Sequence, residues 1–549
     1  MSRREAWLSA LGVFVVAIVV RAAAARGIVF PRPEDSAYYV GVARNLVEGR
    51  GLVSDALWSF GTPPLTFPRP AFEVWLPLPS LLAAIPMALF AGPAPISLLD
   101  GLRSAQLVMV PLGALVPVLA WRLAADVAAE RMLPVGRART LALGTGLTAA
   151  AYLPLVLHSI VPDSTIPFGV LALAACLLAT RVLRDPRGAR LTDPRLIGIG
   201  LLLGAAALTR NEAAWFALAW AWLAWRSTGL SRATRARLVG VVAVISLVVF
   251  APWAFRDWRT FGNPLPGQAL SNALSVTGFD IFAWQDPPTL ARYLAAGPSR
   301  LLEMRVEGIG HNLFNVLLFL GIPLSAVGLV SLPWQARDRA LRPLVLVGGL
   351  TFLVTSLAFP VATTWGTFLH AAVPVHVLLI VAALAATDAG LARIGARLGW
   401  TRQVAWLGAL LGIAASALFS AALVPQLGVG AQDAARTYEV LASELGAPGS
   451  ALDGSAPVIT DFPIWVAETG RVSTLALPDE SPTAILDLAS HFGARWLVLT
   501  GGERGDWPGV LRGPDPAAMC FVPVPVAVPA DPADAAAIRD VLVYRIGCP

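Results

Sequence analysis

An acidic pair, Glu34-Asp35, follows the first hydrophobic stretch of the chain. It lies in the run Pro33-Glu34-Asp35-Ser36-Ala37-Tyr38-Tyr39, which is rich in polar and aromatic residues. A carboxylate beside a bilayer is costly unless water solvates it or the protein uses it. One use is as a general base, which takes the proton of an attacking hydroxyl. The pair is therefore the first candidate for catalysis.

The same residues also suit the start of a helix. Asp35 or Ser36 can cap the first turn, and acidic side chains are favourable near a helix N-terminus. Taken alone, the pair leaves capping and catalysis both open.

The composition is that of a membrane protein. Of the 549 residues, 56% are hydrophobic and only 14% are charged, whereas soluble proteins carry about 25% charged residues. The sequence has no lysine, so its 41 basic residues are all arginine. They cluster in short loops between hydrophobic stretches, which is a topology signal and not that of nucleic-acid binding. Three cysteines and five histidines form no zinc or haem motif.

The arginine loops predict the topology. They run from Arg122 to Arg139, Arg181 to Arg195, Arg226 to Arg237, Arg337 to Arg342, and Arg393 to Arg402. If all five are cytoplasmic, an even number of spans must separate each from the next. The hydrophobic stretches fit this rule at 141–160 and 165–182, 196–209 and 212–225, 238–255 and 312–331, and 343–360 and 367–386. The stretches 196–209 and 212–225 are short for a bilayer of ~30 Å, so we expect that hairpin inside the bundle.

Residues 73–91 decide on which side of the membrane the later arginine loops lie. If they crossed the membrane, every later arginine loop would lie outside. Their prolines and Trp75 favour an interfacial segment instead. The first outer loop is then 25–100, and the second span is 101–121. The apolar run from Trp7 to Val20 is read as a retained first span, because Arg21 and Arg26 leave no convincing cleavage site.

The predicted fold is an all-α polytopic bundle of about 11 spans in the plasma membrane, with outer juxtamembrane helices. Its N-terminus is cytoplasmic and its C-terminus lies outside. The outer face then collects the polar residues Glu34, Asp35, Asp55, Glu73, Asp100, Arg103, His158, Asp163, Arg210, Glu212 and Arg256, with the long loop 256–311.

A soluble tail follows the bundle, because hydropathy falls after Leu423. We divide the chain into a membrane domain, 1–428, and an extracytoplasmic α/β domain, 429–549. Strands are predicted at 457–460, 472–477, 496–500 and 541–545, and helices at 432–445 and 482–493. Cys520 and Cys548 lie in this tail, where an oxidising compartment permits a disulfide, and two free thiols are the alternative.

At these residues the sequence resembles the GT-C superfamily of membrane glycosyltransferases, in the branch of protein O-mannosyltransferases and lipid A aminoarabinose transferases. The likeness is carried by Asp35-Ser36-Ala37-Tyr38-Tyr39, Ala43-Arg44-Asn45-Leu46, Gly49-Arg50-Gly51, Pro68-Arg69-Pro70, Trp75-Leu76-Pro77-Leu78, Arg103, Leu208-Thr209-Arg210-Asn211-Glu212 and Pro252-Trp253 with Arg256. It covers roughly residues 1–390. Several relatives show the order Asp-Glu where this chain has Glu-Asp, so the resemblance leaves open which carboxylate is the base.

The resemblance implies transfer of a sugar from a polyprenyl-phosphate donor to an acceptor hydroxyl outside the cytoplasm, with inversion. Asp35 would be the base, with Glu34 its neighbour. Some relatives bind a divalent cation, Mg²⁺ or Mn²⁺, and there Asp35 and Asp163 would hold it. The sequence itself establishes no cofactor. Arg103, Arg210 and Arg256 would bind the donor phosphate, and Tyr38, Tyr39, Trp75, Glu212 and His370 would line the substrate site. The loop 256–311 would cover the cavity as a lid.

Each of these residues also has a structural interpretation. Asp163 can cap the helix after it. Arg103 and Arg256 can extend toward the outer interface. Arg210 and Glu212 can form an ion pair that closes a short hairpin.

A transporter or flippase of lipid-linked sugars is the rival function. It would also place arginines near phosphate, but we find no inverted repeats, which many transporters contain. A scaffold with a binding module in its tail is a third hypothesis. Removing residues 430–549 separates the enzyme from the scaffold, because an enzyme core should keep some transfer, whereas the function of a scaffold should vanish.

Overall fold

The computed structural model describes residues 3–90, 92, 95–185, 190–400 and 404–548. Parts of two predicted arginine loops, 186–189 and 401–403, lie outside the described residues, as do 1–2, 91, 93–94 and 549.

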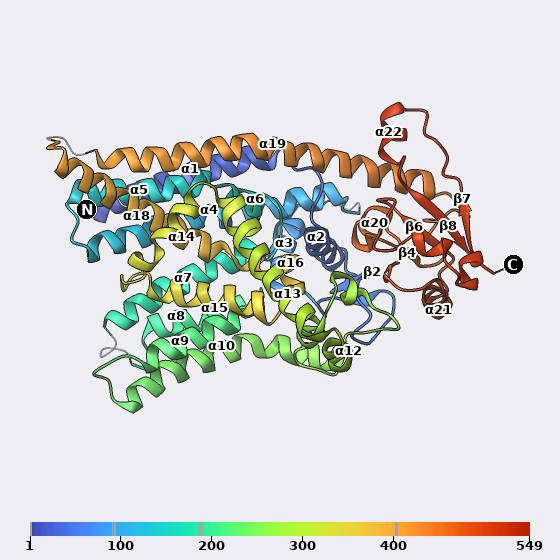
Figure 1. Ribbon diagram of the computed structural model, residues 1–549, viewed down its shortest axis with the longest axis horizontal. Coiled ribbons are helices and arrows are strands. Elements are labelled where there is room, and N and C mark those ends of the chain that lie inside the picture. The colour runs from blue at the N-terminus through green and yellow to red at the C-terminus, as the bar shows by residue number, and fades with distance from the viewer. Residues whose placement is uncertain (1–2, 91, 93–94, 186–189, 401–403, 549) are drawn as a thin grey trace.

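The membrane part is a helical bundle (Figure 1). Its helices are α1 (Arg3–Ala25), α4 (Leu98–Glu130), α5 (Val135–Ala151), α6 (Leu153–Ile160), α7 (Thr165–Arg184), α8 (Pro194–Ala207), α9 (Ala213–Trp225), α10 (Arg232–Phe261), α13 (Gly297–Gly310), the π-helix η2 (His311–Phe319), α14 (Leu324–Gln335), α15 (Arg342–Leu357), α16 (Pro360–Thr364), α17 (Thr367–Ala371), α18 (Val373–Arg397) and α19 (Ala405–Leu445).

Six of the described helices are long and apolar enough to cross a membrane, or up to eight if two bent pairs each count as one span. The chain is thus an integral membrane protein. The predicted eleven spans would also require three shorter apolar helices, α8, α9 and α15, to cross.

Two predicted spans are not straight helices. Within 141–160 the chain bends by 50° between α5 and α6. Within 312–331 the chain turns by 113° between η2 and α14. Gly321 and Pro323 lie at this break, and proline cannot donate the backbone hydrogen bond that a continuous helix needs.

Three of the five predicted arginine loops contact one another at one end of the bundle. Arg131 pairs with Asp338, and Arg184 contacts Glu130 at 3.2 Å. The N-terminus lies at this end, and the C-terminal domain lies at the opposite end (Figure 1).

The first loop carries α2 (Glu34–Val47), β1 (Val53–Ser54), β2 (Ala56–Leu57), β3 (Arg69–Pro70) and α3 (Leu78–Phe90). β1 and β3 pair in an antiparallel ribbon. α3 falls within the segment 73–91. Its 13 residues reach about 20 Å, which is short for a bilayer of ~30 Å.

The predicted lid, 256–311, is largely helical. α10 continues to Phe261, so Arg256 lies on this helix and not in a loop. The described elements after it are α11 (Ala269–Leu274), the 3₁₀ helix η1 (Gly278–Phe282), α12 (Leu290–Ala295) and α13.

The C-terminal domain is an α/β unit with β4 (Val458–Thr460), α20 (Pro463–Gly470), β5 (Thr474–Ala476), α21 (Pro482–Phe492), β6 (Trp496–Leu499), β7 (Phe521–Val524), α22 (Pro532–Ala537) and β8 (Leu542–Ile546). The predicted strands correspond to β4, β5, β6 and β8, and the helix at 482–493 corresponds to α21. The predicted helix 432–445 is not a separate element, because it is the end of α19.

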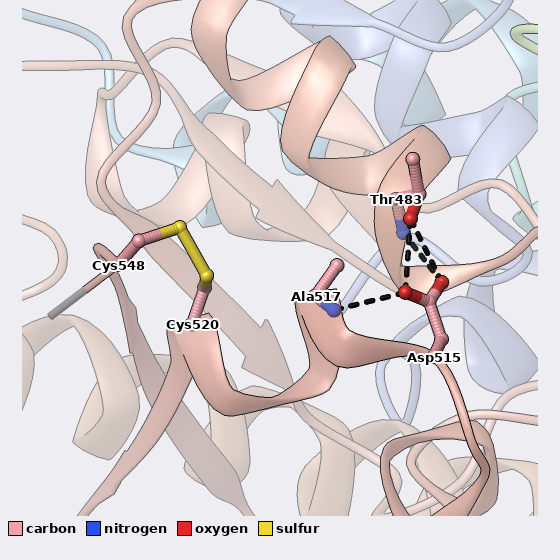
Figure 2. The surroundings of a disulfide bond; sticks show 5 residues. All are labelled: Thr483, Asp515, Ala517, Cys520 and Cys548. Carbon is pink, nitrogen blue, oxygen red and sulfur yellow. Dashed lines mark hydrogen bonds between the residues drawn. A yellow bond between two sulfur atoms is a disulfide. The ribbon is translucent and has the colours of Figure 1, made fainter.

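A disulfide joins Cys520 to Cys548 beside β7 and β8. Figure 2 shows it near Asp515, whose carboxylate accepts hydrogen bonds from Thr483 and from the Ala517 backbone N–H.

The predicted division between residues 428 and 429 does not separate two structural units. α19 runs across this point without a break. The sheet order is β2-β5-β4-β6-β8-β7, so β2 of the first loop is its edge strand and pairs in parallel with β5. Buried side chains of α2, the end of α19 and the C-terminal domain share one apolar core.

Candidate active site

A cavity of about 770 Å³ lies between the first loop, the lid and the bundle. Its polar end is lined by Asp35, Tyr39, Thr209, Arg210, Asn211, Glu212, Thr367 and His370. Its apolar end is lined from α8, α9 and α10 by Leu203, Ala207, Ala217, Trp220, Val239, Val242, Ala243, Leu247 and Phe250. The cavity therefore joins charged groups to an apolar wall formed by bundle helices.

Asp35 lies in the first turn of α2 with its side chain 28% exposed. Its Oδ2 is 3.5 Å from Nε2 of His370. No side-chain hydrogen bond caps α2, whose N-cap position is Pro33. The carboxylate is therefore accessible from the cavity and is not used as a helix cap.

His370 links Asp35 to Asp163. Its Nδ1 lies 2.8 Å from the Thr165 hydroxyl and 3.4 Å from Oδ2 of Asp163. On the other side of Asp163, Nδ1 of His158 lies 3.0 Å from the same oxygen. Burial alone would raise the pKa of Asp163, but His158 and His370 hold that pKa well below its usual range. Asp163 is therefore an anion between two imidazoles.

Asp163 also contacts the start of α7, whose first residue is Thr165. Its Oδ1 accepts the backbone N–H of Thr165 at 2.8 Å. One oxygen of Asp163 therefore caps the helix, and the other contacts His158 and His370 in the site.

Arg210 lies in the turn between α8 and α9 and forms the ion pair expected with Glu212, at 2.9 Å. Its Nη1 donates to Ser164 Oγ at 2.8 Å, and its Nη2 donates to the Thr367 carbonyl at 3.2 Å. Burial would lower the pKa of Arg210, but the Glu212 carboxylate raises it. The guanidinium is thus charged and held in place at the polar end of the cavity.

Only two of the three aromatic candidates line the cavity. Tyr39 and Trp75 line the cavity. Tyr38 lies behind them, where its hydroxyl accepts the Phe72 backbone N–H at 2.7 Å and its ring is 4.2 Å from that of Trp75. Tyr38 is therefore a packing residue of the wall.

Glu34 faces away from the cavity, because adjacent helical residues point about 100° apart. Its Oε1 accepts the backbone N–H of Ile464 in the C-terminal domain at 3.0 Å. Burial raises the pKa of Glu34 to about 8, while Arg504 acts in the opposite direction. The structure therefore separates the two members of the acidic pair.

Arg103 and Arg256 do not join Arg210 in the cavity lining. Arg103 lines a different groove, and its Nη1 donates to the Ala25 carbonyl at 2.7 Å. Arg256 donates to the Ala71 carbonyl at 2.9 Å and lies 4.8 Å from the Trp253 ring centroid. The predicted cluster of three arginines on one phosphate is therefore not formed.

The described part of the chain adds cavity residues that the sequence did not single out, among them Trp58, Gln268 and Trp365. His158 was noted only as an outer-face residue. Its spacing of five residues before Asp163 was the available signal for its role beside that carboxylate.

Neither a protein-family model nor a curated protein matches the sequence. Solved structures do match. The archaeal oligosaccharyltransferase AglB from Archaeoglobus fulgidus, in complex with an inhibitory peptide and a dolichol-phosphate, has a TM-score of 0.56 at 13% identity. The match covers 95% of this chain and 73% of AglB. ArnT from Cupriavidus metallidurans, bound to undecaprenyl phosphate, has a TM-score of 0.56 at 13% identity, over 97% of both chains.

The chain has the GT-C fold. A second A. fulgidus oligosaccharyltransferase structure, a complex with Zn and sulfate, has a TM-score of 0.57 at 14% identity, over 94% of this chain and 71% of its own. The structural likeness thus covers nearly the whole of this chain.

The two predicted metal ligands, Asp35 and Asp163, both contact His370. His158, Asp163 and His370 also offer ligand atoms within 4.8 Å of one another. Two imidazoles and a carboxylate suit Zn²⁺ or Mn²⁺ better than Mg²⁺, which prefers oxygen ligands and octahedral geometry.

Proposed function

We propose that the protein is a glycosyltransferase that moves a sugar from a polyprenyl-phosphate donor to an acceptor hydroxyl. One observation carries the proposal: Asp35 and Arg210 lie at the polar end of a cavity whose other end is apolar and formed by bundle helices. A base, a phosphate-binding cation and a lipid-compatible wall are the three groups that this reaction needs.

Asp35 is the proposed base. The acceptor hydroxyl gives its proton to the Asp35 carboxylate, and its oxygen forms a bond to the anomeric carbon. The bond between that carbon and the donor phosphate oxygen breaks, and the electron pair leaves with the phosphate. Attack opposite the leaving group inverts the anomeric configuration.

Arg210 is the proposed phosphate ligand. Guanidinium groups bind phosphate through several charge-assisted hydrogen bonds. Arg210 is already oriented by Glu212, Ser164 and Thr367. A preorganised cation stabilises the charge that grows on the leaving phosphate without further reorganisation.

The apolar wall is the proposed site of the polyprenyl tail. Leu247 lines the cavity and is 66% exposed on α10. The cavity therefore reaches the lipid-facing surface of the bundle, so a long tail can extend into the bilayer while its phosphate lies near Arg210.

In a metal-dependent form of the proposal, His158, Asp163 and His370 would hold the ion, which would supply positive charge to the site. Asp35 and Arg210 have the same proposed roles with or without the ion.

The test compares two carboxylate-to-amide variants at adjacent positions. Asp35→Asn should lower transfer of a labelled sugar by about 10²–10⁴-fold, the usual contribution of a general base. Glu34→Gln should keep most of the activity. Donor binding should be unchanged in both, which excludes misfolding. Normal transfer by Asp35→Asn would refute the assignment of the base. Movement of donor across proteoliposomes without transfer would favour a flippase.

A further inference from the structure

A second groove lies between the end of α1, α3 and the start of α4. It has a volume of about 650 Å³ and shares no lining residue with the first cavity. Arg26 and Arg103 lie at its polar end, with Ser104 and Gln106 beside them. Apolar side chains of all three helices form the rest: Ile18, Ala22, Met87, Phe90, Leu107, Val110 and Pro111.

Hydrogen bonds hold the Arg103 guanidinium in place but do not use all of its N–H donors. Its Nη1 donates to the Ala25 carbonyl and to Gln106, and its Nη2 donates to the Arg26 carbonyl at 3.0 Å. A guanidinium has five N–H donors, so two remain, including the one on Nε. These interactions hold the group at the end of α1 and leave it able to bind an anion.

Arg26 is exposed, and no side-chain partner of it is found in the described part of the chain. Asp100 also lines the groove, where it accepts a hydrogen bond from the Ser97 hydroxyl at 2.7 Å. Two guanidinium groups face one carboxylate, so the polar end carries an excess of positive charge.

The apolar part of the groove opens onto the surface of the bundle. Phe90 is 70% exposed and Leu107 is 58% exposed. α4, which carries Leu107, is long enough to cross the membrane, and α3, which carries Phe90, packs against it, so both side chains meet lipid. A cation at the end of a lipid-facing apolar groove matches a phosphate headgroup and its acyl chain.

We propose that this groove binds an anionic glycerophospholipid of the surrounding membrane. The phosphate contacts Arg26 and the free edge of Arg103, and one acyl chain lies along Phe90, Leu107 and Val110. Zwitterionic lipids are disfavoured, because their ammonium group would meet the same two arginines. The proposal does not depend on the glycosyltransferase assignment, since it uses none of those residues.

The test counts the lipids that the purified full-length protein retains in native mass spectrometry. Phosphatidylglycerol, phosphatidylcholine with identical acyl chains, and undecaprenyl phosphate are added separately and in competition. Arg26→Gln removes one charge, and Ser104→Trp fills the groove without changing charge. Arg259→Gln, at an exposed arginine near the end of α10, is the matched control.

We expect the wild type to prefer phosphatidylglycerol over phosphatidylcholine by about tenfold, the effect of one charge-assisted hydrogen bond. Arg26→Gln and Ser104→Trp should each remove this preference, and Arg259→Gln should keep it. Equal retention of both phospholipids, or a full preference in Arg26→Gln, would overturn the proposal. So would displacement of phosphatidylglycerol by undecaprenyl phosphate in the wild type but not in Ser104→Trp, which would assign the groove to the carrier lipid.

Discussion

Glu34 places a carboxyl group at the contact between α2 and the C-terminal domain. There it accepts one backbone hydrogen bond, from Ile464, and lies beside Asp461 and Arg504. The Arg504 guanidinium contacts the ring of Phe282, 4.3 Å away, and its Nε and Nη2 have no hydrogen-bond partner among the described residues. Glu34 thus lies where α2, the lid and the C-terminal domain contact one another.

This environment predicts a pH dependence of stability. The pKa of Glu34 rises from 4.5 to about 8 in the folded protein, so the folded state binds the proton more tightly than the unfolded chain. The stability that Glu34 contributes is complete below about pH 4.5 and is lost as the pH rises toward 8. Between pH 5 and 9 the Tm of the wild type should fall by a few degrees relative to Glu34→Gln. Parallel Tm profiles would contradict the pKa.

The arginine assignment gives a second prediction. Arg210→Gln should lower kcat/KM for a labelled donor by about 10²–10³-fold, because it removes a preorganised cation from the leaving phosphate. Arg300→Gln, which removes an exposed arginine that contacts Glu303 and Glu307 on α13, serves as control and should leave the rate unchanged. Equal rates in the two variants would remove Arg210 from the mechanism.

Sequence patterns identified Asp35, Arg210, Glu212 and His370 as site residues, and all four line one cavity. Sequence patterns could not show which of Glu34 and Asp35 faces the cavity, because that depends only on the direction in which the helix points each side chain. The resemblance also grouped Arg103 and Arg256 with Arg210. Only the packing of α1 against α4 places Arg103 in a different groove.

Among the elements, α2 depends on the C-terminal domain for its position. Arg44 of α2 forms a buried ion pair with Glu468 of α20, with both side chains at most 3% exposed. Arg471 contacts Glu48 at 2.8 Å, and Trp465 Nε1 donates to the Pro31 carbonyl at 2.9 Å. The helix that carries Asp35 is therefore held between the bundle and α20.

Breaking the buried pair should therefore be costly. Arg44→Met leaves Glu468 without its partner, and such a change costs about 3–5 kcal/mol. Thermal unfolding should show a large loss of stability, with reduced sugar transfer. The double variant Arg44→Met/Glu468→Leu removes both charges and should recover much of the stability. A double variant as unstable as the single one would show that the pair is not the source of the effect.

Helices of uniform hydrophobicity and the strands of the tail were predictable, because burial imposes a clear pattern on each. The end of α19 was not, since a polar helix that continues from a span looks like a new element. β2 was not predictable either. Its two residues carry no periodicity, and they form a strand only because β5 offers an edge.

For the molecule as a whole, the C-terminal domain is expected to be essential and not an accessory. Removal of residues 446–549 leaves α19 intact but takes away β5, Ile464 and Glu468, the partners of β2, Glu34 and Arg44. We therefore expect the truncated protein to lose transfer entirely, in contrast to the partial activity that the sequence predicted.

The control for truncation is the double variant Cys520→Ser/Cys548→Ser. It removes a cross-link near β7 and β8, at the sheet edge opposite β2, and should cost about 3–4 kcal/mol by the loop-entropy model while keeping transfer. Full activity in membranes containing only the truncated chain would show that the bundle orients α2 on its own.

The pairing of β2 with β5 also constrains biosynthesis. About four hundred residues separate Leu57 from Thr474, and at 5–20 residues per second a ribosome needs roughly 20–80 s to make them. During that interval the edge strand has been made but has no partner, and every later helix must still enter the membrane. The sheet is thus completed only after the membrane helices have been made, and we expect Asp35 to reach its final position only then.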